Sequence, residues 1–136
     1  MESITFNLIS QQHDQLNNDF PKGQKSAEVG NRAVKIVKMY FEEKYPGCTF
    51  NVPKDGCDLE VLPHNIKLEI KGTSSPDIAW NQLKVSGNPS YNQLLNDLPL
   101  FRVTNVYDRE ITIHILTYSE DFIMQREPRW AIKKRK

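Results

Sequence analysis

The sequence predicts a single α/β domain built around a mixed sheet with flanking helices. Apolar residues recur at helical spacing from residue 26 to residue 45, and period-two alternation then indicates three short strands and, after a mixed segment, two more. A chain of 136 residues with 38% hydrophobic content is large enough for one core and leaves little room for a second domain. The expected order is a helix, a three-stranded meander, an irregular or helical crossover and further strands.

The first 22 residues form an N-terminal segment that is rich in Gln and Asn, and its sparse apolar positions allow a helix. Pro21-Lys22-Gly23 ends this segment. A longer helix is predicted from Ser26 to Tyr45, where Pro46-Gly47 stops it. Its apolar stripe consists of Val29, Ala33, Ile36, Val37, Tyr40 and Phe41.

Three antiparallel strands should follow the helix, because short alternating segments are separated by turn residues. They are expected at about Cys48–Val52, Cys57–Leu62 and Ile66–Lys71. Residues 73–99 are mixed, with two short helical or irregular pieces at 80–85 and 91–98. Two more strands are predicted at Leu100–Val106 and Ile111–Tyr118.

Charged residues on the second and third of these strands share one face. Leu68 and Ile70 point to one side of their strand and Glu69 and Lys71 to the other, while alternation on the preceding strand places Asp58 on the same polar side. Asp58 and Glu69 supply the minimum of oxygen ligands that Mg²⁺, or Mn²⁺ as a substitute, requires. A lysine beside such a cation suits phosphodiester hydrolysis. The alternative is an ordinary strand face with a neighbouring Lys/Glu pair.

These residues stand in two short motifs, Gly56-Cys57-Asp58 and Leu68-Glu69-Ile70-Lys71-Gly72-Thr73. The pattern resembles the PD-(D/E)XK nuclease superfamily, the restriction-endonuclease-like fold, over roughly residues 23 to 118. The resemblance implies an αβββαβ core in a mixed sheet. It also implies that Asp58, Glu69 and the backbone carbonyl of Ile70 are metal ligands and that Lys71 lies beside the attacking water. Cys57 departs from the superfamily pattern, in which proline is common at that position.

The resemblance implies three further site residues. Many members carry a glutamate at the start of the first helix, and Glu28 matches it, although an acid after a Ser26 N-cap also suits the helix dipole. Related domains often place a polar residue after the Glu-x-Lys strand, where this chain has Gln82 and then Lys84. Both would equally suit the exposed side of a short helix.

Charge is distributed unevenly along the chain. Residues 126–136 contain six basic residues and one acid, which is a net charge of +5. Because the whole chain has a net charge of +1, the residues before them have a net charge of −4. We divide the chain into an N-terminal segment (1–22), a nuclease-like domain (23–125) and a basic C-terminal tail (126–136). The tail would contact DNA phosphates through its basic residues and stack an aromatic ring on a base. The alternative is a solvated, disordered terminus. The candidate contacts are Arg126, Arg129, Trp130, Lys133, Lys134 and Arg135.

The expected function is a magnesium-dependent endonuclease acting on DNA in restriction, repair or mobile-element defence. A domain of this size has little surface for reading bases, so specificity would come from a homodimer, from DNA structure or from a protein partner. The alternatives are a non-catalytic nuclease-fold module that binds nucleic acid or protein, and a structure-selective junction resolvase. Two cysteines and no long apolar run predict a cytoplasmic protein with no membrane contact.

Overall fold

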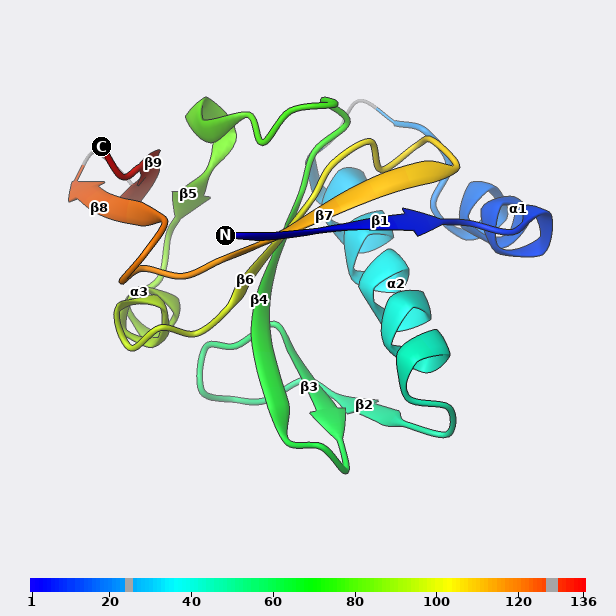
Figure 1. The fold of residues 1–136 in the computed structure, drawn as a ribbon, viewed down its shortest axis with the longest axis horizontal. Coiled ribbons are helices and arrows are strands. Elements are labelled where there is room, and N and C mark those ends of the chain that lie inside the picture. The colour runs from blue at the N-terminus through cyan, green and yellow to red at the C-terminus, as the bar shows by residue number, and fades with distance from the viewer. Residues whose placement is uncertain (24–25, 127–129) are drawn as a thin grey trace.

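The computed structural model describes residues 1–23, 26–126 and 130–136. In these residues three helices accompany a six-stranded mixed sheet and a smaller three-stranded sheet (Figure 1). The helices are α1 (Ser10–Asp19), α2 (Ser26–Lys44) and α3 (Asn88–Leu95), with a 3-10 turn η1 (Trp80–Gln82). The strands are β1 (Glu2–Asn7), β2 (Thr49–Asn51), β3 (Leu59–Leu62), β4 (Ile66–Gly72), β5 (Lys84–Val85), β6 (Leu100–Val103), β7 (Glu110–Leu116), β8 (Phe122–Arg126) and β9 (Trp130–Lys134).

The large sheet has the order β1-β7-β6-β4-β3-β2. Strands β4 and β6 run parallel, and every other neighbouring pair is antiparallel. The predicted α/β class, the long helix α2 and the antiparallel meander β2-β3-β4 are thereby confirmed, as are the two later strands β6 and β7.

The first hydrophobic core lies between α2 and one face of the large sheet, where Ile36 and Val37 pack near Leu68 and Ile70. This contact depends on Gly72, because a Cβ there would lie 2.6 Å from the Cβ of Ala33. The helix can therefore approach the end of β4 closely. Among the described residues, no helix combines the length and the apolar character needed to cross a membrane.

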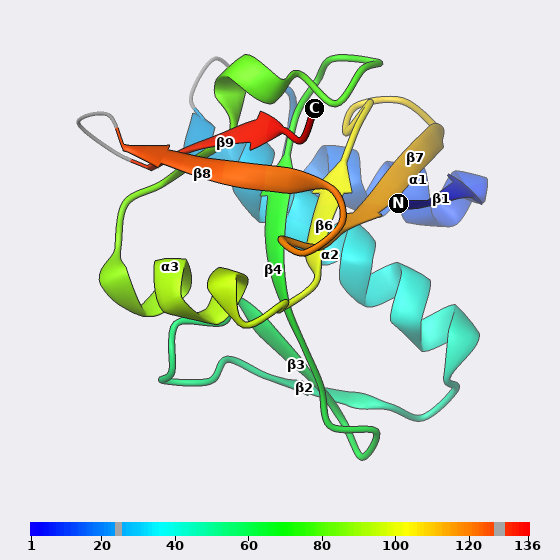
Figure 2. The ribbon, with the colours of Figure 1, turned by 60° about the vertical axis from the view of Figure 1, so that its left-hand side comes forward.

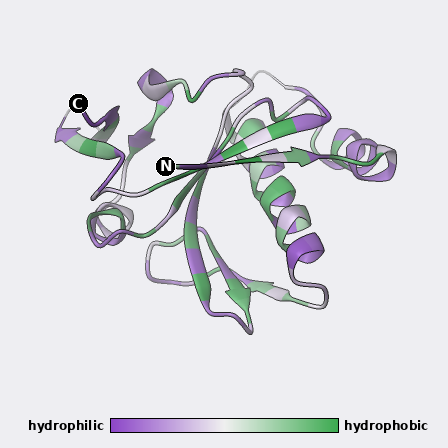
Figure 3. Ribbon diagram, in the orientation of Figure 1, coloured by the Kyte–Doolittle hydropathy of each residue, from purple (hydrophilic) through white to green (hydrophobic). Residues whose placement is uncertain are grey.

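The opposite face of the large sheet is covered by a second layer made from α3, β5, β8 and β9. Leu100 and Leu116 of the sheet form a second core with Leu83, Phe122 and Ile132 of that layer. Figure 2 shows β8 and β9 crossing in front of β4, with α2 behind it. Figure 3 shows the alternation of hydrophobic and hydrophilic residues along β4, and the mostly hydrophilic residues of α1.

The two ends of the chain are more regular than their sequences indicate. The helix allowed within residues 1–22 is α1 alone, because residues 2–7 form β1, which pairs with β7 through Ile4 and Ile113. At the other end, the described part of the basic tail is mostly strand: β9 pairs with β8 and also with β5, where Lys84 lies opposite Ala131. The tail therefore belongs to the second layer.

Candidate active site

The pairing of β3 with β4 brings Asp58 and Glu69 together. Leu59 lies opposite Leu68, and the backbone N–H of Asp58 donates to the Leu68 carbonyl at 3.0 Å, so the next pair in the register is Asp58 and Glu69. Period-two alternation then directs Glu69 to the face away from the apolar residues that pack on α2. Asp58 Oδ2 accepts a hydrogen bond from the backbone N–H of Ile70 at 2.7 Å. One carboxyl group is thus held against the strand that carries the other.

The backbone carbonyl of Ile70 lies on the same side of β4 as Asp58. In a β-strand the N–H and the C=O of one residue point to the same side, so this carbonyl leaves β4 on the side where Asp58 lies. The described residues contain no group of three His, Cys, Asp or Glu side chains placed to hold a metal ion. A cation here would depend on two carboxylates, the Ile70 carbonyl, and water or phosphate oxygens, which is a ligand set that Mg²⁺ accepts.

Glu69 has an unusual environment for a carboxyl group. It is only 2% exposed, and its Oε1 atom is buried without a hydrogen-bond partner among the described residues. The pKa of Glu69 is raised to about 8, mainly by burial and then by the hydrogen bond and charge of Asp58, while Lys71 opposes the shift. A buried carboxyl oxygen without a partner is costly, and a bound cation would satisfy it.

Lys71 follows Glu69 by two residues and therefore shares its face of β4. Its Nζ atom lies 4.0 Å from Glu69 Oε2, and its side chain is 33% exposed. Asp58, Glu69 and Lys71 therefore lie on the face of the sheet away from α2, and Glu69 is buried opposite Leu100 of the second core. The chain thus places two carboxyls and one ammonium side by side.

Lys71 also lines a cavity of about 350 Å³ at the free edge of β4, beyond the point where β3 ends. We call this the Lys71 cavity. It lies between the start of α2 and the segment from η1 to the residues after β5. The polar side chains that line it belong to Ser26, Lys71, Gln82, Lys84, Ser86 and Arg102. The predicted residues Gln82 and Lys84 are therefore brought next to Lys71.

Gln82 is fixed in this position by its amide oxygen. Gln82 Oε1 accepts a hydrogen bond from Thr73 Oγ1 at 2.8 Å and a longer one from Arg102 Nη2 at 3.5 Å. The amide NH₂ group of Gln82 is then the donor that it can offer to the cavity.

Arg102 is a site residue that sequence reasoning missed. It is only 2% exposed, and its guanidinium donates to the carbonyls of Ile78, Gly72 and Ala79 at 2.7, 3.0 and 3.3 Å. No carboxylate in the described chain lies within ion-pair distance of it, and burial lowers the pKa of Arg102 to about 10. The sequence feature that could have pointed to Arg102 is the presence of a charged residue within the otherwise apolar strand Leu100–Val103.

Glu28 is not brought to this site. The Glu28 carboxyl packs directly against Gly23, in the space that a Cβ on that residue would occupy. Residues four apart share a face of a helix, so Glu28 lies on the side of α2 that carries Arg32, opposite the side of Ser26 and Gly30 that borders the Lys71 cavity. The structure therefore gives Glu28 no contact with the Asp58–Glu69 pair.

Arg126, Trp130 and Arg135, which were predicted to contact nucleic acid, pack against other parts of the protein. The Trp130 ring stacks on Tyr91 with centroids 4.2 Å apart and planes at 10°, and the Arg126 guanidinium lies 5.9 Å from the same indole. Arg135 donates to the carbonyls of Tyr118 and Phe122 at 2.6 and 3.0 Å. Trp130 and Arg135 therefore contribute to the packing of the second layer.

The lysines of the tail lie at the surface of the small sheet. Lys133 and Lys134 are exposed on β9, and strand alternation sends them to opposite faces of the small sheet. Arg129, which was predicted to contact nucleic acid, lies outside the described residues.

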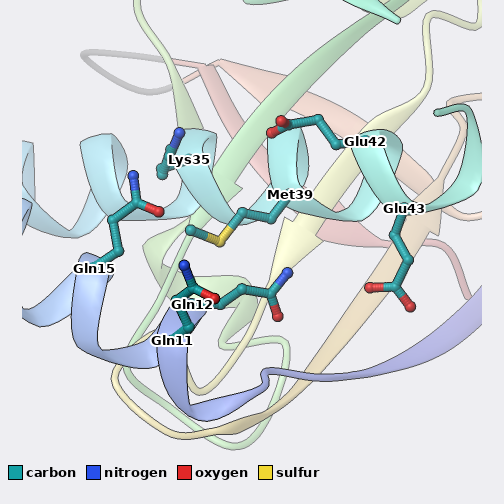
Figure 4. A pocket seen from close by; sticks show the side chains of 7 residues that line it. All are labelled: Gln11, Gln12, Gln15, Lys35, Met39, Glu42 and Glu43. Atoms are coloured by element: carbon teal, nitrogen blue, oxygen red, sulfur yellow. The ribbon is translucent and has the colours of Figure 1, made fainter. Parts of the chain in front are cut away.

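A larger cavity of about 450 Å³ lies between α1 and α2, shown in Figure 4. It lies on the far side of α2 from the sheet, so the helix and the sheet separate it from Glu69. Apart from Met39 its lining is polar, and it carries charges of both signs, which gives it no preference for one class of ligand. The lining residues are Gln11, Gln12, Gln15, Lys35, Met39, Glu42 and Glu43.

No protein-family model, curated protein or solved structure compared with this chain matches it. The arrangement of Asp58, Glu69 and Lys71 is consequently the observation that bears on function.

Proposed function

We propose that this protein is a divalent-metal-dependent endonuclease that hydrolyses DNA phosphodiester bonds. The observation that carries the proposal is the convergence of Asp58 and Glu69 on facing strands, with Lys71 Nζ 4.0 Å from the Glu69 carboxyl. The order α2-β2-β3-β4-β5-α3-β6 supports it, because apart from the two-residue strand β5 it follows the αβββαβ order expected of a restriction-endonuclease-like core.

The residues present fit a hard cation such as Mg²⁺ or Mn²⁺. Asp58 and Glu69 would hold it together with the Ile70 carbonyl, and the buried Glu69 Oε1 would gain the partner that it lacks among the described residues. When bound, the cation would supply Lewis acidity toward the phosphodiester and lower the pKa of a coordinated water.

The side chains of the protein have separate tasks in this proposal. The Ile70 N–H fixes the orientation of Asp58, and Glu69 must release its proton before it acts as a ligand. Lys71 places a positive charge between the carboxyl pair and the cavity, where it stabilises negative charge that develops on the phosphate or orients the attacking water. Gln82 presents its amide at the other side of that cavity.

The burial of Glu69 supports a second candidate function, a non-catalytic module that binds nucleic acid or protein. In that case the carboxyl stays protonated at neutral pH and no cation is held. A junction resolvase would use the same site as the endonuclease and differ only in its substrate.

The deciding experiment is cleavage of supercoiled plasmid and of a branched oligonucleotide with Mg²⁺ or Mn²⁺. The native chain should cut, and Asp58→Ala and Lys71→Ala should each lose about 100-fold or more in rate. Lys54→Ala, at an exposed lysine on the turn before β3, is the matched control and should cut normally. Preference for the branched substrate would favour a resolvase.

Two outcomes would count against the endonuclease. Native protein that retards DNA in a gel but leaves every substrate intact would favour the binding module. Normal cutting by a folded Lys71→Ala variant would show that the activity arises elsewhere.

A further inference from the structure

We propose that the Lys71 cavity is a phosphate-binding site, and that it holds the DNA phosphate next to the one being cleaved. The second part rests on the proposed function, because it requires the carboxyl pair to be the cutting site. The first part stands on the charge and the donors of the cavity.

The lining of the cavity is cationic. Lys71, Lys84 and Arg102 contribute to it, and among the described residues that line it none is acidic. Arg102 matters most, because its hydrogen bonds go to neutral carbonyls and no carboxylate of the described chain pairs with it. A buried cation without a counter-charge is costly, and an anion in the cavity would offset that cost.

Neutral donors surround the same space. Ser26 is the first residue of the 19-residue helix α2, so its hydroxyl lines the cavity at the end of the helix that carries the positive end of the dipole. The Gln82 amide and the Ser86 hydroxyl complete the lining. Glu28, the acid of that first helical turn, lies on the opposite side of the helix against Gly23.

The position of Lys71 connects the cavity to the carboxyl pair. Its Nζ atom is 4.0 Å from Glu69 on one side, and its side chain lines the cavity on the other. A nucleic-acid strand that lies over Lys71 would therefore place one phosphate at the carboxyls and its neighbour in the cavity. Because Lys84 pairs with Ala131, Lys84 and Lys133 share a face of the small sheet, and the basic surface continues along β9.

The first test is binding without metal, so that no cleavage occurs. Full-length protein in EDTA is titrated with inorganic phosphate and, separately, with a short oligothymidine, and backbone amide shifts are followed by NMR. Both probes should shift residues at the start of α2 and from η1 to Ser86. Lys84→Gln should weaken both interactions by about tenfold, as expected for loss of one charge-assisted contact, whereas Lys54→Gln should not.

Each result bears on the proposal. Shifts that stay away from the cavity, or equal binding by native and Lys84→Gln proteins, would overturn it. If phosphate binds in the cavity but the oligonucleotide does not displace it, the site takes free phosphate and the assignment to DNA is wrong.

A cleavage assay with Mg²⁺ separates this inference from the proposed function. Lys84→Gln should raise the KM for DNA about tenfold with little change in kcat. If the native protein cuts DNA but the cavity binds no phosphate, the inference fails and the nuclease stands. If the cavity binds phosphate but the native protein cuts nothing, the site remains a phosphate site and its place beside a scissile bond is lost.

Discussion

Lys71 and Arg102 occupy paired positions on the neighbouring parallel strands β4 and β6. A half-buried ammonium and a buried guanidinium therefore emerge side by side from the same face of the sheet. Like charges at paired positions repel each other, and no carboxylate of the described chain pairs with Arg102. This positive surface is built on the rigid part of the fold, which is where a binding site keeps its geometry best.

Replacing Arg102 should destabilise the protein. Arg102→Met leaves the carbonyls of Gly72, Ile78 and Ala79 without their donor, so we expect the free energy of unfolding to fall by about 3 kcal/mol. Lys71→Met removes the repulsion at the paired position and should leave stability unchanged or slightly raised. Urea unfolding of both variants checks this contrast, and equal losses in the two would contradict it.

The stability of the protein should depend on pH through Glu69. Its pKa is about 8 in the folded protein and near 4.5 when unfolded, so the folded state holds this proton more tightly. The resulting stabilisation is complete below pH 4.5 and is lost as the pH rises to about 8. Glu69→Gln should remove this fall in the free energy of unfolding. Urea unfolding between pH 5 and pH 9 measures the difference from native protein, with Glu60→Gln as the control.

Metal binding should become tighter as the pH rises. Because Glu69 must lose its proton to bind a cation, Mg²⁺ should raise the Tm more at pH 9 than at pH 6.5. Asp58→Asn and Glu69→Gln should abolish the increase at both pH values. Differential scanning calorimetry with Mg²⁺ and with EDTA measures it, and a Tm that responds equally in the Asp58→Asn variant would argue for a different metal site.

Substitution by alanine should have opposite effects on stability at two glycines near the site. Gly72→Ala forces a Cβ to within 2.6 Å of Ala33 Cβ and 3.1 Å of the Val29 carbonyl, so it should destabilise the protein by about 1–3 kcal/mol. Gly30→Ala meets no atom within 4 Å and replaces a glycine inside α2, so it should stabilise by about 0.5–1 kcal/mol. Chemical denaturation of the pair tests the close contact of α2 with β4.

Neighbouring basic residues at the C-terminal end should differ in role. Lys133 is exposed on the face of the small sheet that carries Lys84, so Lys133→Ala should weaken DNA binding and reduce the slope of log affinity against log salt by about 1. Arg135→Ala should leave that slope unchanged and lower stability by about 1–2 kcal/mol, because Arg135 bonds two carbonyls. Salt titrations of DNA binding together with urea unfolding separate the two effects.

The meander and its carboxyl pair were predictable because their signals are local. Turn residues and period-two alternation place Asp58 and Glu69 on adjacent strands, and the register of β3 with β4 follows from the short turn between them. The approach of Gln82 and Lys84 to Lys71 was inferred only from resemblance, because it depends on how the segment after β4 folds back. Whether the pair binds a metal stays a prediction.

Four features could not be read from local patterns. Strand β1 is defined by its pairing with β7, and β9 by its pairing with the two-residue strand β5, so both depend on segments far away in the chain. Glu28 was expected near the carboxyl pair, but its helical position directs it toward Gly23. Arg102 looked like an interruption of an apolar strand, and its role became visible only through the carbonyls that surround it.

The pairing of Glu2–Asn7 with Glu110–Ile115 has a consequence for the order of folding. The meander joins segments that are close in sequence and can form early, whereas β1 must wait until a strand near the other end of the chain has been made. Such distant pairing closes a long loop and slows folding. Until it forms, β7 presents an open edge and part of the core under α2 is uncovered, so the protein should be most vulnerable to aggregation and proteolysis during synthesis and refolding.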